Sequence, residues 1–229
     1  MQRLLIHVEG QTEETFVNEV LAPHLYNSGF ISVGARLLGN SRIRGGVPSW
    51  RSAKADFLRH LKARRRCCHT TMVDYYGMPQ SEGRVWPGRL EAVRLPSAEK
   101  APTVERAIFE QIRIELEDDL HPDQFVPFVL MHEFEGLLFS DCDRFGRGIG
   151  RPDLTPLLQA IRDQFRTPEE INDSPVTAPS KRIIGLMPKY EKPLFGALAS
   201  LEIGLDRIRR ECPHFDEWLS RLEKLPKGG

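Results

Sequence analysis

The feature that most constrains the fold is an alternation of short apolar runs with segments of helical periodicity. Four runs have the length and composition of buried strands, at 3–8, 30–38, 70–75 and 125–131. Between them, the spacing of apolar residues predicts helices over 12–25, 49–66 and 103–119. Strands that alternate with helices are typical of α/β proteins. We therefore predict a mostly parallel central sheet flanked by helices, in which Pro127 favours an edge position or a bulge for the fourth strand.

The domain organisation follows from the same pattern, which becomes mainly helical after residue 153. A length of 229 residues suits one large domain, or one domain with an extension. We expect an α/β core over 1–150 and a helical C-terminal extension over 151–229 that packs on the core. The segment 77–102 is rich in glycine and proline, which predicts a long loop, and loops of that length are usually functional.

Composition excludes several classes of protein. Lys and Arg total 32 and so do Asp and Glu, so the formal net charge is zero, which argues against a binder that works by bulk charge. No apolar run approaches the ~20 residues that span a bilayer, so we expect no membrane association. The apolar run at the start of the sequence is too short for a signal peptide. The four cysteines show no CxxC spacing, which is typical of reduced thiols in a cytoplasmic protein.

The neutral total hides a local separation of charge. From Arg36 to Arg66 there are ten basic residues against one acid, Asp56. Between Glu105 and Asp123 the sign reverses, with seven acids against two arginines. Charge segregated in this way can give one face that attracts a polyanion. The alternative is a basic helix face that is simply solvated.

Acidic residues follow three of the four predicted strands. Glu9 comes directly after the first, Asp74 ends the third, and Glu133 and Glu135 follow the fourth. In open α/β sheets, ligands bind beyond the carboxyl ends of the strands, and neighbouring strands lie ~4.8 Å apart. Crowded carboxylates need a compensating charge, and Mg²⁺ prefers oxygen ligands of this kind. The sequence therefore predicts a metal-binding carboxylate cluster at this edge of the sheet.

Glu13 is a further candidate for the cluster. It lies four residues after Glu9, in the first turn of the predicted helix, and Gly10 permits the tight turn that would direct it back. The alternative for each acid is a solvated loop residue or a helix cap, which is the interpretation we favour for Glu14.

The segment after the fourth strand leaves a choice between two acids. If a helix begins near His132, Glu133 and Glu135 project about 200° apart. We therefore expect one of them to face the site and favour Glu135. His132 is either a hydrogen-bond donor to a carboxylate or a capping residue.

Three strings, VEGQTEETFV, TMVDYYG and HEFEGLLFSD, resemble the Toprim catalytic fold of topoisomerases, primases and overcoming-lysogenization-defect (OLD) nucleases. With INDSPVTAPSKRI, YEK and the segment 203–219, their order is similar to a Toprim-like bacterial family of unassigned function. The resemblance spans nearly the whole chain and implies a Toprim-like α/β core. Members of that family resemble genes found beside an ATPase of the ABC or SMC type. This context implies an ATPase partner and a role in defence against phage.

The resemblance also assigns residues. The Toprim glutamate corresponds to Glu9, and the first acid of its Asp-x-Asp motif corresponds to Asp74. The second acid of that motif is absent, because Tyr76 stands in its place. One metal ligand of the family pattern is therefore missing, and Glu133, Glu135 or Asp141 would have to supply its charge.

Together, the cluster and the resemblance imply a nuclease that uses Mg²⁺ or Mn²⁺ to hydrolyse phosphodiester bonds in DNA or RNA. The expected metal ligands are Glu9, Glu13, Asp74, Glu133 and Glu135. The expected catalytic residues are Glu9, Glu13, Asp74, Glu135 and Lys181, with Glu13 as a ligand or general base and Lys181 neutralising the phosphate. The expected nucleic-acid-binding residues are Arg42, Arg44, Lys181, Arg182 and Lys192. For Lys181 and Arg182 the alternative is a solvated pair at a helix start.

A different class of function competes with the enzyme. The chain could be a non-catalytic binding or regulatory subunit of an ATPase complex, an alternative that Tyr76 favours because it removes a family ligand. Nucleotide hydrolysis lacks support, since no GxxxxGK[ST] loop occurs. Apolar positions in the C-terminal helices leave room for a homodimer.

Overall fold

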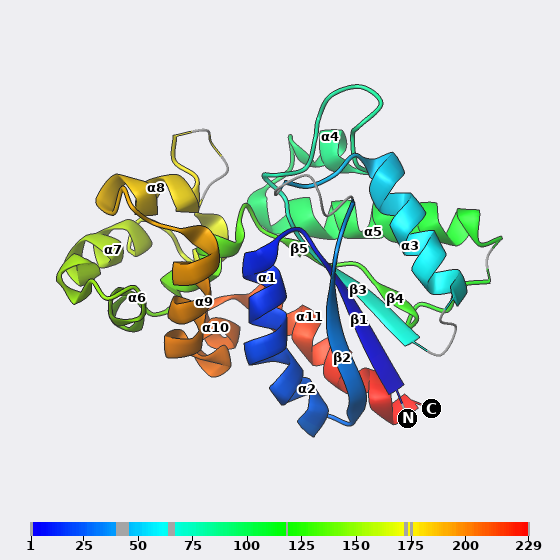
Figure 1. Ribbon diagram of the computed structural model, residues 1–229. Helices are drawn as coiled ribbons and strands as arrows, with labels where there is room; N and C mark the ends of the chain where they lie inside the picture. Colours follow the sequence, from blue (N-terminus) through cyan, green and yellow to red (C-terminus); the bar gives the residue numbers. More distant parts are fainter. Residues whose placement is uncertain are drawn as a thin grey trace.

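The computed structural model describes residues 2–39, 46–63, 67–117, 119–171, 174 and 176–228. In these residues the sheet has five strands: β1 (Gln2–Val8), β2 (Phe30–Leu37), β3 (Cys67–Asp74), β4 (Phe125–Val126) and β5 (Val129–Leu130). Their order is β2-β1-β3-β4, β5 also pairs with β3, and these pairings are parallel. The predicted α/β class, a mostly parallel sheet flanked by helices, is therefore confirmed (Figure 1).

The central strands β1 and β3 are buried because helices cover both faces of the sheet. All eight residues of β3 are buried, and Ile6 and Val8 of β1 are fully buried. Val8 lies opposite Met72 in the register of the two strands. Both strands therefore reach the same edge of the sheet with their carboxyl ends, which is the edge where Glu9 and Asp74 follow.

The fourth predicted strand is present but interrupted at Pro127. β4 and β5 continue the same register along β3, with Val126 opposite Thr70 and Val129 opposite Val73. At the interruption, Thr71 Oγ1 accepts the N–H of Phe128 at 2.8 Å and lies 2.7 Å from the Phe128 carbonyl oxygen, to which it donates. A side chain thus replaces the backbone pairing that proline prevents.

One face of the sheet is covered by four elements: α1 (Gln11–Phe16), the π-helical turn Val17–Leu21, α2 (Ala22–Asn27) and α11 (Pro213–Lys224). Trp218 of α11 stacks on Phe128 with a centroid distance of 4.2 Å. Its indole N–H donates to Thr70 Oγ1 at 2.8 Å, so the hydrogen-bonding group of this buried ring is satisfied. The last helix of the chain is therefore part of the main core.

The other face is covered by α3 (Trp50–Ala63) and α5 (Ser97–Glu115). The prediction for 77–102 is wrong in part, because this segment contains α4 (Arg89–Ala92) and the first turns of α5. The helix expected over 103–119 begins earlier, at Ser97, so Pro102 lies inside α5. Proline withholds an N–H from the carbonyl four residues earlier, which belongs to the exposed Ala98, where water can bind it.

A group of helices lies beside the carboxyl end of the sheet (Figure 1). Its α-helices are α6 (Cys142–Gly148), α7 (Thr155–Arg162), α8 (Pro179–Leu186), α9 (Lys192–Ile203) and α10 (Leu205–Glu211). Short 3₁₀ helices occur at Phe134–Ser140, Pro152–Leu154, Pro168–Glu170 and Leu225–Gly228. No helix in the described ranges has both the length and the apolar character needed to cross a bilayer.

Helix α9 packs closely against α1 and α6 because each contact contains a glycine, Gly196 on α9 itself and Gly148 on α6. A Cβ on Gly196 of α9 would lie 2.8 Å from the Thr12 methyl group of α1. A Cβ on Gly148 of α6 would lie 2.6 Å from the Cα of Ala199 in α9. Helices at this separation have no room for a side chain, so α9 is held in one position against the core.

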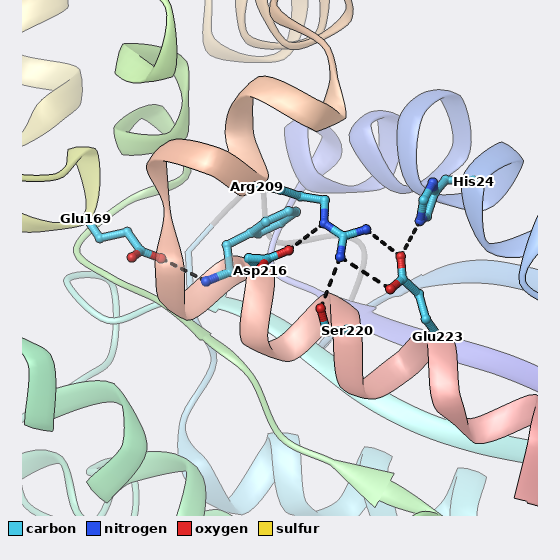
Figure 2. Close-up of polar contacts among 7 residues, drawn as sticks. His24, Glu169, Arg209, Asp216, Ser220 and Glu223 are labelled. Carbon is cyan, nitrogen blue, oxygen red and sulfur yellow. Dashed lines mark hydrogen bonds and ion pairs between the residues drawn. The ribbon is translucent and has the colours of Figure 1, made fainter.

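Helix α11 is fixed at both ends by polar side chains (Figure 2). At its start, the Glu169 carboxylate accepts the backbone N–H groups of residues 214 and 215, which would otherwise lack a helical partner. Further along, Arg209 of α10 donates to Asp216, Ser220 and Glu223. His24 of α2 also contacts Glu223. Helices α9 and α11 lie beyond residue 150 and pack on elements before it. The expected boundary at residue 150 stays a prediction.

Candidate active site

Glu9 and Asp74 meet at the carboxyl ends of β1 and β3. The backbone N–H of Asp74 donates to Glu9 Oε2 over 3.4 Å. Gly77 closes over the same carboxylate, because a Cβ at this position would lie 3.2 Å from Glu9 Oε2. The absence of a side chain at residue 77 therefore leaves the room that the Glu9 carboxylate occupies.

Glu13 lies in the first turn of α1, and its side chain is only 6% exposed. Its Oε2 accepts the N–H of Gly10 at 3.0 Å and so caps the helix. The charge of Glu13 raises the pKa of Glu9, so the two carboxyls lie within electrostatic reach. The two interpretations of Glu13, as a helix cap and as a member of the cluster, both describe its position.

The expected helix start near His132 is wrong. His132 has a φ of +65°, Glu133 is extended, and a 3₁₀ helix begins only at Phe134. The predicted separation of Glu133 and Glu135 by about 200° does not apply, because it assumed one continuous α-helix. Both carboxyl groups are buried, Glu133 at 6% and Glu135 at 1% exposure. His132 instead receives the backbone N–H of Tyr76 on its carbonyl oxygen at 2.9 Å.

The segment with Glu133 and Glu135 is joined to the sheet and to the C-terminal helices. Asp74 Oδ1 accepts the backbone N–H of Phe134 at 2.9 Å. Glu133 accepts the N–H and the hydroxyl of Ser180, at 2.8 and 3.0 Å, at the start of α8. We call Glu9, Glu13, Asp74, Glu133 and Glu135 the acidic cluster. Its members come from three parts of the chain that are distant in sequence.

Lys192, the first residue of α9, supplies a positive charge to the acidic cluster. Its Nζ lies 3.0 Å from Glu135 Oε2 and 3.8 Å from Glu133 Oε1. That Lys192 binds nucleic acid stays a prediction, and in this structure its ammonium group is engaged by two carboxylates. Its raised pKa, which these acids cause in spite of burial, keeps it positively charged.

The acidic cluster carries more negative charge than Lys192 can balance. Burial raises the pKa of Glu9 to about 8, and the neighbouring Glu13 charge adds to the effect. Burial also raises the pKa of Glu13, to about 7, and raises those of Asp74 and Glu135. Bound protons or a bound cation are the two ways to compensate such a site.

The donor set suits a divalent cation in its chemistry, because buried carboxylate oxygens are the ligands that Mg²⁺ and Mn²⁺ prefer. In the part of the chain that the structure describes, no three His, Cys, Asp or Glu side chains already form a group that could hold a metal ion. Glu13, Asp74 and Glu133 each accept a backbone N–H. Each of these carboxylates has a second oxygen and further lone pairs, so the hydrogen bonds that hold it in place leave it able to bind a cation.

Several predicted residues have no contact with the acidic cluster among the contacts described. Lys181 on α8 is exposed, and Arg182 donates to the Thr177 carbonyl at 2.8 Å and lies over the Phe165 ring. Asp141 caps α6 by accepting the N–H of residue 144, so it does not replace the missing Toprim acid. Arg42 and Arg44 lie outside the described residues.

Sequence reasoning missed Ser180, which fixes Glu133. The segment TAPSKR was singled out for its charged residues Lys181 and Arg182, because charge is the most visible signal in a sequence. The signal for Ser180 was its place beside Pro179 in the first turn of a helix, where backbone N–H groups lack partners and bind acids.

The fold and the acidic cluster define an α/β protein whose parallel sheet carries buried acids at its carboxyl end. Residues 8–223 match the family model described as "Domain of unknown function (DUF4276)", and the chain belongs to this family. No curated protein matches the chain.

Among solved structures, the chain is similar to the C-terminal regions of two OLD proteins. The region from Burkholderia pseudomallei is 18% identical, with a TM-score of 0.48 and coverage of 98% of each chain. The region from Xanthomonas campestris pv. campestris is also 18% identical, with a TM-score of 0.41 and coverage of 96% of this chain and 94% of the other.

Proposed function

We propose that the acidic cluster is the active site of a metal-dependent nuclease that hydrolyses phosphodiester bonds of DNA or RNA. We further propose that the chain acts as the effector subunit of an ATPase-associated system for defence against phage. The support from sequence is the set of motifs that resembles Toprim nucleases, which includes Glu9 and Asp74.

The observation that carries the proposal is the convergence of buried acids at the carboxyl end of a parallel sheet. Glu9, Asp74 and Glu135 come from three separate segments, and the charge of Glu135 contributes to raising the pKa of both Glu9 and Asp74. A protein rarely buries several carboxylates together without a functional reason, since each costs free energy to desolvate. This edge of an α/β sheet is also where ligands of such folds bind.

In this proposal, Glu9, Glu13, Asp74, Glu133 and Glu135 would hold the cation. A bound Mg²⁺ or Mn²⁺ supplies an activated water and neutralises charge on the phosphate oxygens. Glu13 would alternatively take the proton of the attacking water, for which its pKa of about 7 is suited. Lys192 would hold Glu135 in place and, when that pair opens, bind a phosphate oxygen. Lys181 and Arg182 would contact the nucleic acid further from the reacting atoms.

The test is a cleavage assay on DNA and RNA with Mg²⁺ or Mn²⁺, with and without the ATPase partner. We expect Glu9→Gln and Asp74→Asn to lower the rate by at least ~1,000-fold, because each removes a charge from the reacting centre. Asp153→Asn is the matched control, since Asp153 is exposed and pairs only with Arg151 among the contacts described. Cleavage by Glu9→Gln at the wild-type rate would rule out the proposed site.

A non-catalytic binding or regulatory role in an ATPase complex is the second candidate. Two observations favour it: Tyr76 in place of the second Toprim acid, and the absence, in the described residues, of a ready group of three metal ligands. This alternative expects assembly with an ATPase and no cleavage under any metal condition. The same assay, with complex formation measured by size-exclusion chromatography, separates the two functions.

A further inference from the structure

The hydroxyl group of Tyr190 is buried beside the acidic cluster and has no hydrogen-bond partner in the residues that the structure describes. The Tyr190 side chain as a whole is 8% exposed. It belongs to the YEK segment, two residues before Lys192, and precedes α9. Buried tyrosine hydroxyls nearly always have a partner, because losing water without gaining a bond costs free energy.

The surroundings of the hydroxyl explain why no partner is at hand. A Cβ on Gly196 would lie 3.6 Å from Tyr190 Oη, and the same point lies 3.6 Å from Phe134 Cε1 and 2.8 Å from the Thr12 methyl group. The hydroxyl thus lies close to the backbone of Gly196, in a region that Phe134 and the Thr12 methyl group also border. The Tyr190 ring also stacks on Phe195, which fixes its direction.

The Tyr190 hydroxyl lies within electrostatic reach of Glu133 and Glu135, both of which pair with Lys192. We call these two acids and Lys192 the Lys192 corner of the site. Phe134, which borders the same space at Gly196, lies between Glu133 and Glu135 in the chain, and Asp74 Oδ1 accepts its N–H. Lys192 pairs with Glu135, with 3.0 Å between Nζ and Oε2. Burial and the charges of Glu135 and Glu133 raise the pKa of Tyr190, so its hydroxyl stays protonated and remains a donor at ordinary pH.

We propose that Tyr190 is a substrate-binding residue whose hydroxyl donates a hydrogen bond to a phosphate oxygen of the nucleic acid at the Lys192 corner of the site. This inference rests on the proposed function. A phosphate oxygen is an acceptor with negative charge, and it would satisfy the Tyr190 hydroxyl, which has no partner among the described residues. Donors to such oxygens form shorter and stronger bonds than those to neutral acceptors.

The test compares Tyr190→Phe with the wild type and with Tyr26→Phe. Tyr26 is a matched control, since it lies on α2, is 47% exposed and donates to the Val33 carbonyl. The wild type and both variants are measured for cleavage of an oligonucleotide with Mg²⁺ or Mn²⁺. They are also measured for binding of the same oligonucleotide with Ca²⁺, and for melting temperature without ligand.

We expect Tyr190→Phe to weaken oligonucleotide binding and to lower kcat/KM, each about 10- to 100-fold, the worth of one bond to a charged oxygen. We expect its melting temperature to equal or exceed that of the wild type, because the hydroxyl has no partner to lose. A purely structural tyrosine would show the opposite pattern, a lower melting temperature with unchanged binding.

Three results would overturn the inference: wild-type binding by Tyr190→Phe, a melting temperature lowered by several degrees, or no oligonucleotide binding by the wild type. The proposed function fails separately. If the wild type binds but never cleaves, while Tyr190→Phe binds more weakly, the nuclease is wrong and the phosphate-binding role of Tyr190 stands. If the wild type cleaves and Tyr190→Phe does so equally well, only the inference about Tyr190 is wrong.

Discussion

At the scale of single residues, the acidic cluster buries more carboxyl groups than the ammonium group of Lys192 can neutralise. Glu9 and Glu13 follow a buried strand, and Asp74 ends the strand beside it. Burial raises the pKa of all three carboxyls, and Lys192 is paired mainly with Glu135 rather than with them. The metal-free protein should therefore carry bound protons at this site near neutral pH.

These protons predict a pH dependence of stability. The pKa of Glu9 rises from its ordinary value of 4.5 to about 8 on folding, so the folded state holds a proton that the unfolded state releases. Stability from a raised carboxyl pKa is complete at low pH and is lost as pH rises through the folded value. In EDTA, the free energy of unfolding should fall between pH 6.5 and 8 by about 1.5 kcal/mol for one carboxyl whose folded pKa is about 8.

The measurement is urea unfolding of the wild type and Glu9→Gln across that range. Glu9→Gln should show a smaller decline, since its amide does not titrate. His7 is buried and its pKa is lowered, so it acts mainly below pH 6.5, with the opposite sign. The pKa of His214 is raised because its pairing with Glu105 outweighs burial, and this contribution is common to both proteins. Equal slopes for the two proteins would contradict the prediction.

At the scale of elements, α9 delivers Lys192 and the preceding Tyr190 to the sheet edge, and its position depends on two close contacts. Gly196 approaches Thr12 of α1, and Gly148 of α6 approaches the backbone at Ala199. A methyl group in either place would meet atoms closer than 3 Å. The contact at Gly148 is with backbone, which moves less easily than a side chain.

We expect Gly196→Ala and Gly148→Ala to destabilise the protein by about 1–3 kcal/mol, with Gly148→Ala the more severe. The intrinsic helix propensity of alanine works against this loss by up to ~1 kcal/mol. Gly185→Ala is the matched control, because Gly185 lies in α8 with open space where its Cβ would stand. It should be neutral or stabilising. The check is the urea midpoint of each variant, and stabilisation by Gly196→Ala would show that α9 is not confined as described.

At the scale of the whole molecule, the C-terminal helices complete both the core and the acidic cluster. Phe215, Trp218 and Leu222 of α11 are buried against the sheet face that α1 and α2 also cover. Lys192 reaches the cluster from the same part of the chain. The division at residue 150 therefore separates two segments that share one hydrophobic core.

A fragment of residues 1–150 should accordingly fail to fold into a stable unit. Without α9 and α11 it exposes one face of the sheet and leaves Glu135 without the Lys192 ammonium group. We expect a non-cooperative thermal transition by circular dichroism and aggregation at micromolar concentration, whereas the full chain melts cooperatively. A cooperative melt of the fragment would contradict this prediction and show that residues 1–150 fold without the C-terminal helices.

The sheet and its acids could be predicted because periodicity and position along a strand are local properties. β1, β2 and β3 were predicted within three residues at each end, and Glu9 and Asp74 came from the rule for strand ends. The path after Met131 could not be predicted, since the left-handed backbone of His132 breaks the helical spacing that any calculation from sequence assumes. The role of Lys192 also depends on a long-range approach of α9, which no local pattern contains.

The interruption at Pro127 has a consequence for how molecules of this protein can meet. β4 and β5 form one border of the sheet, and each has only two residues. A strand this short and broken by proline is a poor template for a neighbouring chain, so this border is protected against fibre-like growth and aggregation. The opposite border is the eight-residue β2, with Arg36 exposed on it. Among the described strands, sheet extension between molecules is thus confined to a border that carries a repelling charge.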